Sequence, residues 1–344
     1  MIKDFKDISW DVDEPTYRED SAYSYSTIAK FNREGFEKLP SLFDKVNTPS
    51  LTFGSMVDTM LTDGEEAFNN RFFVATFPKV TEAIAFISQR LCSIYGEEYS
   101  HVYDIPDSKI LELLNEYQYQ PRWKDQTRVQ DITSKCEEYY SQLLLSEGKE
   151  VVSQEDYDDC IACIQSLKES EATKWYFDLN SPWSSVKRYY QLKFKSSYNG
   201  INLRCMADLI VVDYENKTVM PCDLKTSSHM EYDFYRSFIT WRYFIQAQLY
   251  WYIIRQNMDA DPYFKDFKLL DYRFIVINRK SLNPLVWEYP DTQTIIDIEY
   301  GDTKCPNWRN IVTELDYYLK SNSLTPKGIV NNGVNNIVEW LRKQ

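Results

Sequence analysis

The chain has 344 residues, 43% of them hydrophobic and 16% aromatic, so it can bury a substantial core. Its net charge of −13 argues against indiscriminate coating of nucleic acid, although a local basic groove can coexist with an acidic exterior. Only two histidines occur, which disfavours a Ser-His-Asp triad, a Cys-His pair and a multi-histidine zinc centre. Hydrolytic chemistry would have to come mainly from carboxylates, lysine and a bound ion.

The N-terminal half is expected to be helical. Residues 1–20 predict an irregular arm, and a helix should begin at Ser24 or Ser26, where a serine N-cap fits. A second helix is expected from about Thr52 to Leu61. Residues 80–175 are rich in charge and have helical periodicity, which indicates a helical insertion.

From Trp183 onward the pattern indicates strands. A long aromatic helix, from about Tyr235 to Arg255, interrupts them, and the C-terminal stretch is helical again. The expected strands are 186–195, 203–214, 218–226, 272–278 and 284–289. We therefore expect an α/β fold with a mixed sheet flanked by helices. The expected regions are an arm (1–20), N-terminal core helices (21–75), a helical insertion (76–180), the core sheet with its helix (181–290) and a C-terminal helical region (291–344).

No stretch approaches eighteen uncharged apolar residues, and the acidic N-terminus lacks the layout of a signal peptide. We therefore expect a cytoplasmic protein. The seven cysteines are odd in number, and a reducing cytoplasm disfavours a disulfide framework. Cys160 and Cys163 form a lone C-x-x-C, which we interpret as two ordinary buried thiols because no second pair lies nearby.

The second and third strands predict a hairpin with chemistry on one face. A symmetric hairpin centred between Glu215 and Asn216 places Asp208 across from Asp223, with Cβ atoms roughly 4.5–5.5 Å apart. Strand alternation brings Lys225 to the same face.

Two facing carboxylates among apolar neighbours repel each other unless they are neutralised. A divalent cation would neutralise them, and oxygen ligands favour Mg²⁺, with Mn²⁺ as a substitute. Such a site suits hydrolysis of a phosphodiester by metal-activated water, with the lysine positioning or deprotonating that water. A buried ion pair, with Lys225 bridging Asp208 and Asp223, is the structural alternative.

The order of these residues resembles the RecB-like and exonuclease VIII-like branch of the PD-(D/E)XK nucleases. The matching residues are Asp208, then Asp-Leu-Lys-Thr at 223–226, and then Tyr243, Gln246 and Tyr250 on the following helix. That branch shows G-x-x-D, a hairpin, D-[LI]-K-T and a helix with Y-x-x-Q-x-x-x-Y. The resemblance implies that the tyrosines and the glutamine line the site, contact DNA or orient the lysine. An ordinary amphipathic core helix is the alternative for them.

The N-terminal half also resembles this branch. Ser24 and Ser26 match its serine-rich first helix, which implies contacts with DNA. The family's F-G-x-x-x-H helix matches 53–58, with Asp58 in place of a metal-binding histidine and Gly54 allowing close packing. Aspartate can bind the same ion, so we expect Asp58 to be a metal ligand; a helix-surface aspartate is the alternative.

Three positions on the strands depart from the pattern. Ala207 replaces the proline that names the superfamily, and Gln191 falls near a position that is often acidic. As an amide, Gln191 is a poorer metal ligand. Pro221 within the third strand predicts a bulge or an edge.

The resemblance implies a metal-dependent DNA exonuclease of phage-type recombination or repair, acting in the host cytoplasm if phage-encoded. Asp208 and Asp223 would bind Mg²⁺ with the Leu224 carbonyl, and Lys225 would act on water. Arg204 and the basic strand 187–195 would meet phosphates; a solvated strand face is the alternative. Expected partners are DNA and a single-strand annealing recombination protein. A homo-oligomer is also expected, because related exonucleases often form rings.

Two other functions stay open at this point. The first is a catalytically inactive DNA-binding or assembly protein that keeps the fold, which the departures at Asp58 and Gln191 and the net charge favour. The second is an enzyme acting on a small phosphorylated substrate, which a pocket too narrow for a DNA strand would indicate.

Overall fold

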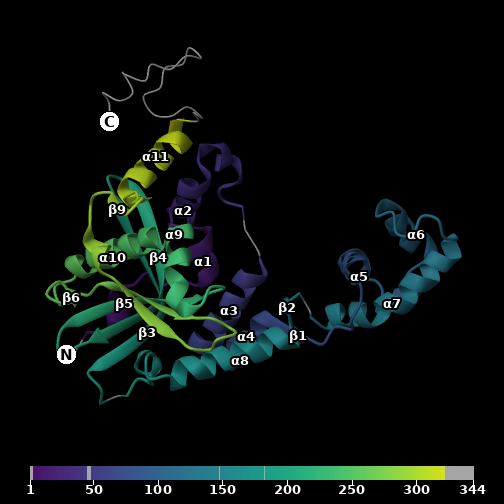
Figure 1. The fold of residues 1–344 in the computed structure, drawn as a ribbon, viewed down its shortest axis with the longest axis horizontal. Coiled ribbons are helices and arrows are strands. Elements are labelled where there is room, and N and C mark those ends of the chain that lie inside the picture. Colours follow the sequence, from purple (N-terminus) through teal and green to yellow (C-terminus); the bar gives the residue numbers. More distant parts are fainter. Residues whose placement is uncertain (1–2, 45–47, 147, 182, 322–344) are drawn as a thin grey trace, which may run out of the picture. The chain divides into compact units, whose positions relative to one another are not determined.

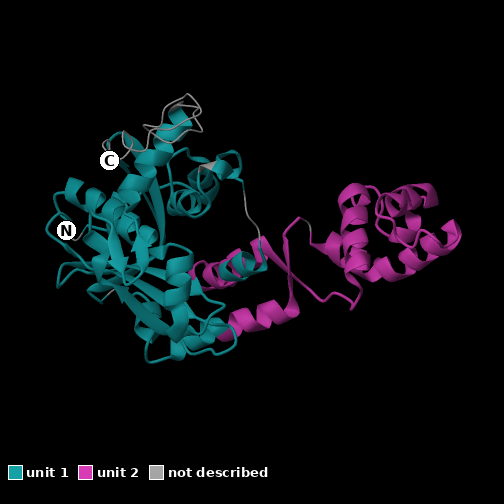
Figure 2. Ribbon diagram, turned by 45° about the horizontal axis from the view of Figure 1, so that its top comes forward, with its two compact units in different colours: residues 1–54, 163–344 teal, residues 55–162 magenta. Residues whose placement is uncertain are grey.

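The computed structural model describes residues 3–44, 48–146, 148–181 and 183–321 (Figure 1). The chain forms two compact units: residues 1–54 with 163–344, and residues 55–162 (Figure 2). The second unit, residues 55–162, begins and ends earlier in the chain than the expected helical insertion, residues 76–180. No helix among the described residues is long and apolar enough to cross a membrane.

A mixed sheet forms the centre of the first unit (Figure 1). Its strands, in spatial order, are β3 (Val186–Tyr198), β4 (Ile201–Asp213), β5 (Thr218–Thr226), β7 (Tyr272–Ile277) and β8 (Leu285–Tyr289). β5 and β7 run parallel, and the other neighbours on this path are antiparallel. The expected α/β fold with a mixed sheet is therefore confirmed, and the five expected strands are joined by a sixth, short strand that pairs with β5.

The β4–β5 hairpin has the expected register. Its ladder pairs residues 209–213 with residues 222–218, so the hairpin is centred between Glu215 and Asn216. Oδ1 of Asp213 accepts hydrogen bonds from the N–H groups of Glu215 and Asn216. Such side-chain bonds stabilise a turn locally, which explains why this register follows from nearby sequence.

Pro221 lies inside β5 and not at an edge of the sheet. Short β6 (Lys268–Leu269) pairs with β5 as far as Val219, and β7 pairs with β5 from Cys222 onward. The proline therefore coincides with a break in the neighbouring strand, where a missing N–H donor costs little.

Helices cover the face of the sheet that carries the candidate site. α10 (Tyr243–Ala260) contacts β3, β4 and β7, and also α2 (Tyr25–Glu34) and α11 (Trp308–Ser321) (Figure 1). Its apolar side chains belong to one core with the sheet, including Phe244, Ile245, Leu249, Ile253 and Ile254. The burial of α10 on several sides explains its nearly continuous apolar sequence.

The expected single helix over 235–255 is wrong in one respect. It is divided into α9 (Phe234–Thr240) and α10, with Arg242 between them in the left-handed region at φ 62°. The guanidinium of Arg242 donates to Oδ1 of Asn32 at 3.0 Å and to the carbonyl of Ile239 at 2.6 Å. These contacts offset the cost of a left-handed arginine.

The N-terminal arm is more regular than expected. A 3-10 turn η1 (Phe5–Ile8) is followed by α1 (Glu14–Glu19), whose N-cap Asp13 accepts from the N–H of Thr16 at 2.8 Å. The next helix, α2, begins at Tyr25 after the N-cap Ser24, as predicted.

The opposite face of the sheet contacts the 3-10 turn η4 (Lys174–Phe177). Arg188 on β3 donates to the carbonyl of Trp175, and Arg273 on β7 donates to the hydroxyl of Tyr176 at 2.8 Å. The remaining strands of the first unit form a small hairpin, β9 (Ile298–Tyr300) and β10 (Thr303–Cys305). The helix expected near 336–343 lies outside the described residues.

The second unit is mainly helical, as predicted. The helices are α3 (Pro49–Thr62), which starts in the first unit, then α4 (Gly64–Arg71), α5 (Glu82–Tyr95), α6 (Asp107–Glu116), α7 (Asp125–Leu145) and α8 (Gln154–Glu169), which ends in the first unit. Buried side chains of α5, α6 and α7 form a separate core. The seven cysteines, all among the described residues, form no disulfide bond, and Cys160 and Cys163 are buried.

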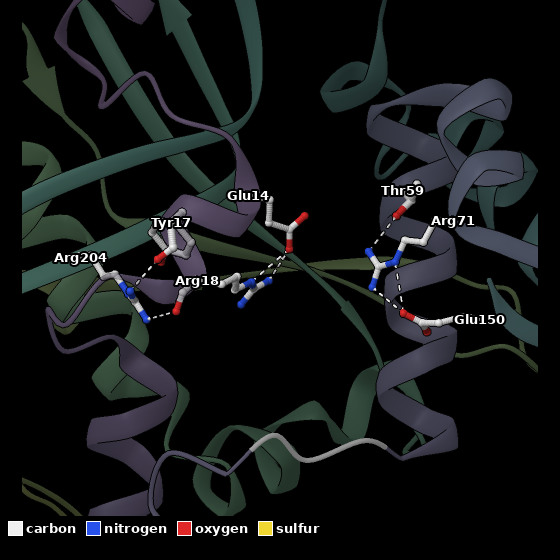
Figure 3. A network of polar contacts seen from close by, with 7 residues as sticks. All are labelled: Glu14, Tyr17, Arg18, Thr59, Arg71, Glu150 and Arg204. Atoms are coloured by element: carbon white, nitrogen blue, oxygen red, sulfur yellow. Dashed lines mark hydrogen bonds and ion pairs between the residues drawn. The ribbon is translucent and has the colours of Figure 1, made fainter. Parts of the chain in front are cut away.

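A parallel strand pair within the second unit was not expected. β1 (Phe72–Ala75) pairs with β2 (Glu150–Ser153), and helices α5, α6 and α7 lie between the two strands in the chain. Arg71 stabilises the pair, because its guanidinium donates to Glu150 and to Oγ1 of Thr59 (Figure 3). Four-residue strands carry too little periodicity to be recognised from sequence.

Candidate active site

β4 and β5 part at the level of Asp208. The ladder ends at the pair Leu209–Cys222, and one further step in the same register leads to Asp208 and Asp223. Beyond it, Oδ2 of Asp208 accepts a hydrogen bond from the N–H of Leu224 at 3.0 Å. A side-chain acceptor thus takes the place of a backbone one, and Asp208 lies beside the segment of β5 that carries Asp223 and Lys225.

The carboxylate of Asp223 is engaged on both oxygens. Only 1% of this residue is exposed. Oδ1 accepts from Nε2 of Gln246 on α10 at 2.5 Å, and Oδ2 lies 2.6 Å from Nζ of Lys225. Asp223 and Lys225 therefore share the face of β5 that meets α10, as strand alternation predicts. The ion pair expected as the structural alternative is present between these two residues.

Lys225 is held as an ammonium ion by its surroundings. Burial alone would lower its pKa, but the negative charges of Asp223 and Asp208 raise the pKa well above its ordinary value. Nζ of Lys225 also lies 4.6 Å from the ring centroid of Tyr243. A cation over an aromatic face is attracted by the ring electrons, so Tyr243 belongs to the site.

Two tyrosines lie deep beside the carboxylates. Tyr250, one turn after Gln246, is buried, and its ring meets that of Tyr272 edge-on at 6.2 Å. Burial raises the pKa of both phenols well above its ordinary value, and the charges of Asp223 and Asp208 add to this effect. Tyr272 was not expected here. Asp223 pairs with Phe274 on β7, and Tyr272 lies two residues before Phe274. No sequence pattern distinguishes Tyr272 from an aromatic residue of the core.

Gln191 lies at the same level of the sheet as Asp208. The β3–β4 register pairs Tyr190 with Leu209 and Leu192 with Ala207, and passes over Gln191 and Asp208 between them. Gln191 has φ 52°, in the left-handed region that side chains other than glycine rarely adopt. The departure noted in the sequence therefore coincides with a local distortion of the strand beside the site.

Arg204 anchors the N-terminal segment on β4. Its guanidinium donates to the carbonyl oxygens of Tyr17, at 2.5 Å, and Arg18, at 3.2 Å (Figure 3). A further bond goes to the carbonyl of Asp20, and the guanidinium lies over the Tyr17 ring at 5.0 Å. Within α1, the guanidinium of Arg18 donates to the carboxylate of Glu14 at 2.9 Å. The expected contact of Arg204 with DNA stays a prediction.

The two serines of the first helix lie close together. Oγ of Ser24, which is buried, is 2.9 Å from Oγ of the exposed Ser26. Ser24 is the N-cap of α2 and directly precedes Tyr25. Contacts of either serine with DNA stay predictions.

Gly54 on α3 packs closely on the end of β5. A Cβ atom at this position would lie 3.2 Å from Oγ1 of Thr226, which is tighter than ordinary van der Waals contact. The predicted close packing at Gly54 is confirmed. Asp58 follows one helical turn later, beyond Ser55 where the second unit begins. Its role as a metal ligand stays a prediction.

The donor set suits a hard divalent cation. Asp208 and Asp223 supply carboxylate oxygens, and Oε1 of Gln246 is buried with no hydrogen-bond partner among the described residues. In that part of the chain, no group of three or more His, Cys, Asp and Glu side chains is gathered for a metal ion. Mg²⁺ commonly binds through one or two carboxylates together with substrate phosphates and waters, and two aspartates match that requirement.

No family model matches this chain, and no curated protein matches it. The chain is similar to the crystal structure of a candidate exonuclease from Eubacterium rectale, with 14% sequence identity and a TM-score of 0.40. The similarity covers 91% of this chain and 84% of the other.

Proposed function

We propose that this protein is a metal-dependent DNA nuclease of the PD-(D/E)XK type, acting as an exonuclease. One observation carries the proposal: Asp208 accepts a hydrogen bond from the N–H of Leu224, the residue between Asp223 and Lys225, whose side chains lie 2.6 Å apart. Two carboxylates and one ammonium leave a charge of −1 at a largely buried position. A divalent cation would more than offset that negative charge, and phosphodiester hydrolysis uses such a cation.

The residues have distinct roles in this proposal. Asp208 and Asp223 would hold Mg²⁺ or Mn²⁺ together with the Leu224 carbonyl, and the ion would supply an activated water. Lys225 would position that water and stabilise the negative charge that develops on the phosphate. Gln246 holds the Asp223 carboxylate in one orientation.

The surrounding side chains limit water and motion. Tyr243 lies over the Lys225 ammonium, and Tyr250, one helical turn after Gln246, is buried. Asp58 as a further ligand, a single-strand annealing partner and a homo-oligomer remain part of the proposal without a described contact. A role in phage-type recombination or repair likewise remains a proposal.

The experiment compares end-labelled linear DNA with closed circular DNA, with Mg²⁺ and with EDTA. We expect Mg²⁺-dependent degradation of linear DNA only, and a loss of at least about 100-fold for Lys225→Ala. Lys135→Ala is the matched control, because Lys135 also forms an ion pair, with Asp131 at 2.7 Å, within the second unit. Cleavage that survives Lys225→Ala would remove this lysine from the mechanism.

A catalytically inactive DNA-binding or assembly protein is the second candidate. The Lys225–Asp223 ion pair favours it, since the more buried carboxylate already has a cationic partner. Binding of DNA without cleavage, with Mg²⁺ or Mn²⁺ and with linear or circular substrates, would decide for this candidate.

A further inference from the structure

A series of contacts between aromatic and basic residues leads away from the candidate site. It starts at Lys225, whose Nζ lies 4.6 Å from the Tyr243 ring centroid, and the Tyr243 ring lies 6.2 Å from that of Tyr25. The Tyr25 hydroxyl donates to the carbonyl of Trp241 at 2.7 Å. The guanidinium of Arg33 lies 5.2 Å from the Trp241 ring centroid. We call these five residues the stacking row.

The outer end of the stacking row is open to solvent. Trp241 is 48% exposed, although large aromatic side chains are usually well buried. Tyr232 and Tyr235, just before it in the chain, are exposed as well, and Arg236 lies 5.4 Å from the Tyr235 ring. An exposed tryptophan linked through Tyr25 and Tyr243 to a candidate site is suited to contact a ligand.

The cations of this surface are only weakly neutralised. Arg33 is 4.0 Å from Glu34, and Arg236 is 3.8 Å from Asp233, both near the limit for an ion pair. Each guanidinium therefore keeps donors for another anion. Phosphate groups that alternate with flat bases match this alternation of cations and rings, which is the pattern of single-strand binding surfaces.

We propose that the stacking row binds a single strand of DNA next to the phosphate that is cleaved, with a base on Trp241 and a phosphate at Arg33. This inference rests on the proposed function and adds the form of substrate that the site holds. A single strand is required because the bases of a duplex are already stacked on one another and cannot stack on a side chain.

The first test measures binding without cleavage. Fluorescence anisotropy of a labelled twelve-nucleotide oligo-dT in EDTA reports the affinity of the full chain. Trp241→Ala should weaken binding about 5- to 150-fold, the loss expected for one stacked base. Trp241→Phe should keep most of the affinity, since a ring remains. The Trp241 carbonyl persists in both variants, so the bond from Tyr25 is preserved.

The matched control is Trp123→Ala. Trp123 is 43% exposed, close to the value for Trp241, and belongs to the second unit. Its removal should leave the affinity unchanged. Equal thermal stability of Trp123→Ala and Trp241→Ala ensures that binding, and not folding, is compared. If both variants bind like the wild type, the inference is overturned.

The second test uses the salt dependence of binding. Arg33→Gln should reduce the slope of log affinity against log salt by about 0.7, the value for one lost phosphate contact with a single strand. Arg122→Gln, at an exposed arginine of the second unit, should leave the slope unchanged. An unchanged slope for Arg33→Gln would contradict the assigned phosphate contact.

The two proposals fail separately. If the wild type cleaves linear DNA with Mg²⁺ but Trp241→Ala binds oligo-dT normally, the stacking row is wrong and the nuclease stands. If the wild type binds blunt duplex or RNA but not oligo-dT, the choice of single-stranded DNA is likewise wrong. If oligo-dT binding depends on Trp241 and no cleavage occurs, the stacking row stands and the nuclease fails.

Discussion

Gln246 on α10 donates a hydrogen bond to Asp223 on β5, and both residues are almost fully buried. The bond crosses from the covering helix to the central sheet, so the orientation of the carboxylate depends on helix packing. The second oxygen of Asp223 faces Lys225. A carboxylate held in this way has little rotational freedom, which favours a preorganised site.

Gln246→Leu should therefore lower Mg²⁺-dependent cleavage about 10- to 100-fold, because Asp223 loses its orienting donor. Gln248→Leu is the matched control. Gln248 is a buried glutamine on the same helix that donates to the Tyr289 hydroxyl at 3.1 Å, away from the carboxylates. Both variants should lose stability, but only Gln246→Leu should require more Mg²⁺ for half-maximal activity. The same Mg²⁺ requirement in both would contradict an orienting role.

Binding of Mg²⁺ should stabilise the folded protein against heat. At a free concentration of 100 times Kd, the expected gain in the free energy of unfolding is about 2.7 kcal/mol. Differential scanning calorimetry with and without Mg²⁺ measures it. Asp223→Asn should abolish the gain, while Asp266→Asn, at an exposed position, should retain it. A gain that persists in Asp223→Asn would place the ion elsewhere.

Gly54→Ala should destabilise the protein, in spite of the better helix propensity of alanine, which is worth about 0.5–1 kcal/mol. The new Cβ would crowd Oγ1 of Thr226, and overpacking costs about 1–3 kcal/mol. Thr226→Ala removes the obstructing atom. In that background Gly54→Ala should become neutral or stabilising, which urea unfolding of the four proteins tests. Additive effects would show that the contact is not the cause.

Tyr272→Phe should leave stability at pH 7 unchanged or increased. The Tyr272 hydroxyl is buried with no hydrogen-bond partner among the described residues, a situation that costs about 1–3 kcal/mol. Its pKa is raised in the fold, so the unfolded chain loses this proton first as the pH rises above about 10. The wild type should thus lose stability above that pH more steeply than Tyr272→Phe.

Thermal unfolding between pH 8 and pH 11 measures this difference. Tyr232→Phe, at an exposed tyrosine, is the control and should follow the wild type. If Tyr272→Phe unfolds more easily at pH 7, its hydroxyl has a favourable partner that the described contacts do not include.

Several features follow from the sequence because their causes are local. The β4–β5 register depends on a short hairpin with Asp213 closing its turn, so counting residues is sufficient to bring Asp208 beside the segment of β5 at 223–225. The common face of Asp223 and Lys225 follows from the alternation of a strand. The close packing at Gly54 followed from the absence of a side chain there.

Tertiary structure decided the contacts between segments that are distant in the sequence. The break at Arg242 depends on Asn32 of α2, and Tyr272 reaches the carboxylates only because β7 pairs in parallel with β5. The sequence shows Arg204 only as one more basic residue on a strand. The packing of α1 directs its guanidinium to backbone carbonyls. Periodicity and turn chemistry act over a few residues, whereas these contacts depend on how whole elements pack against one another.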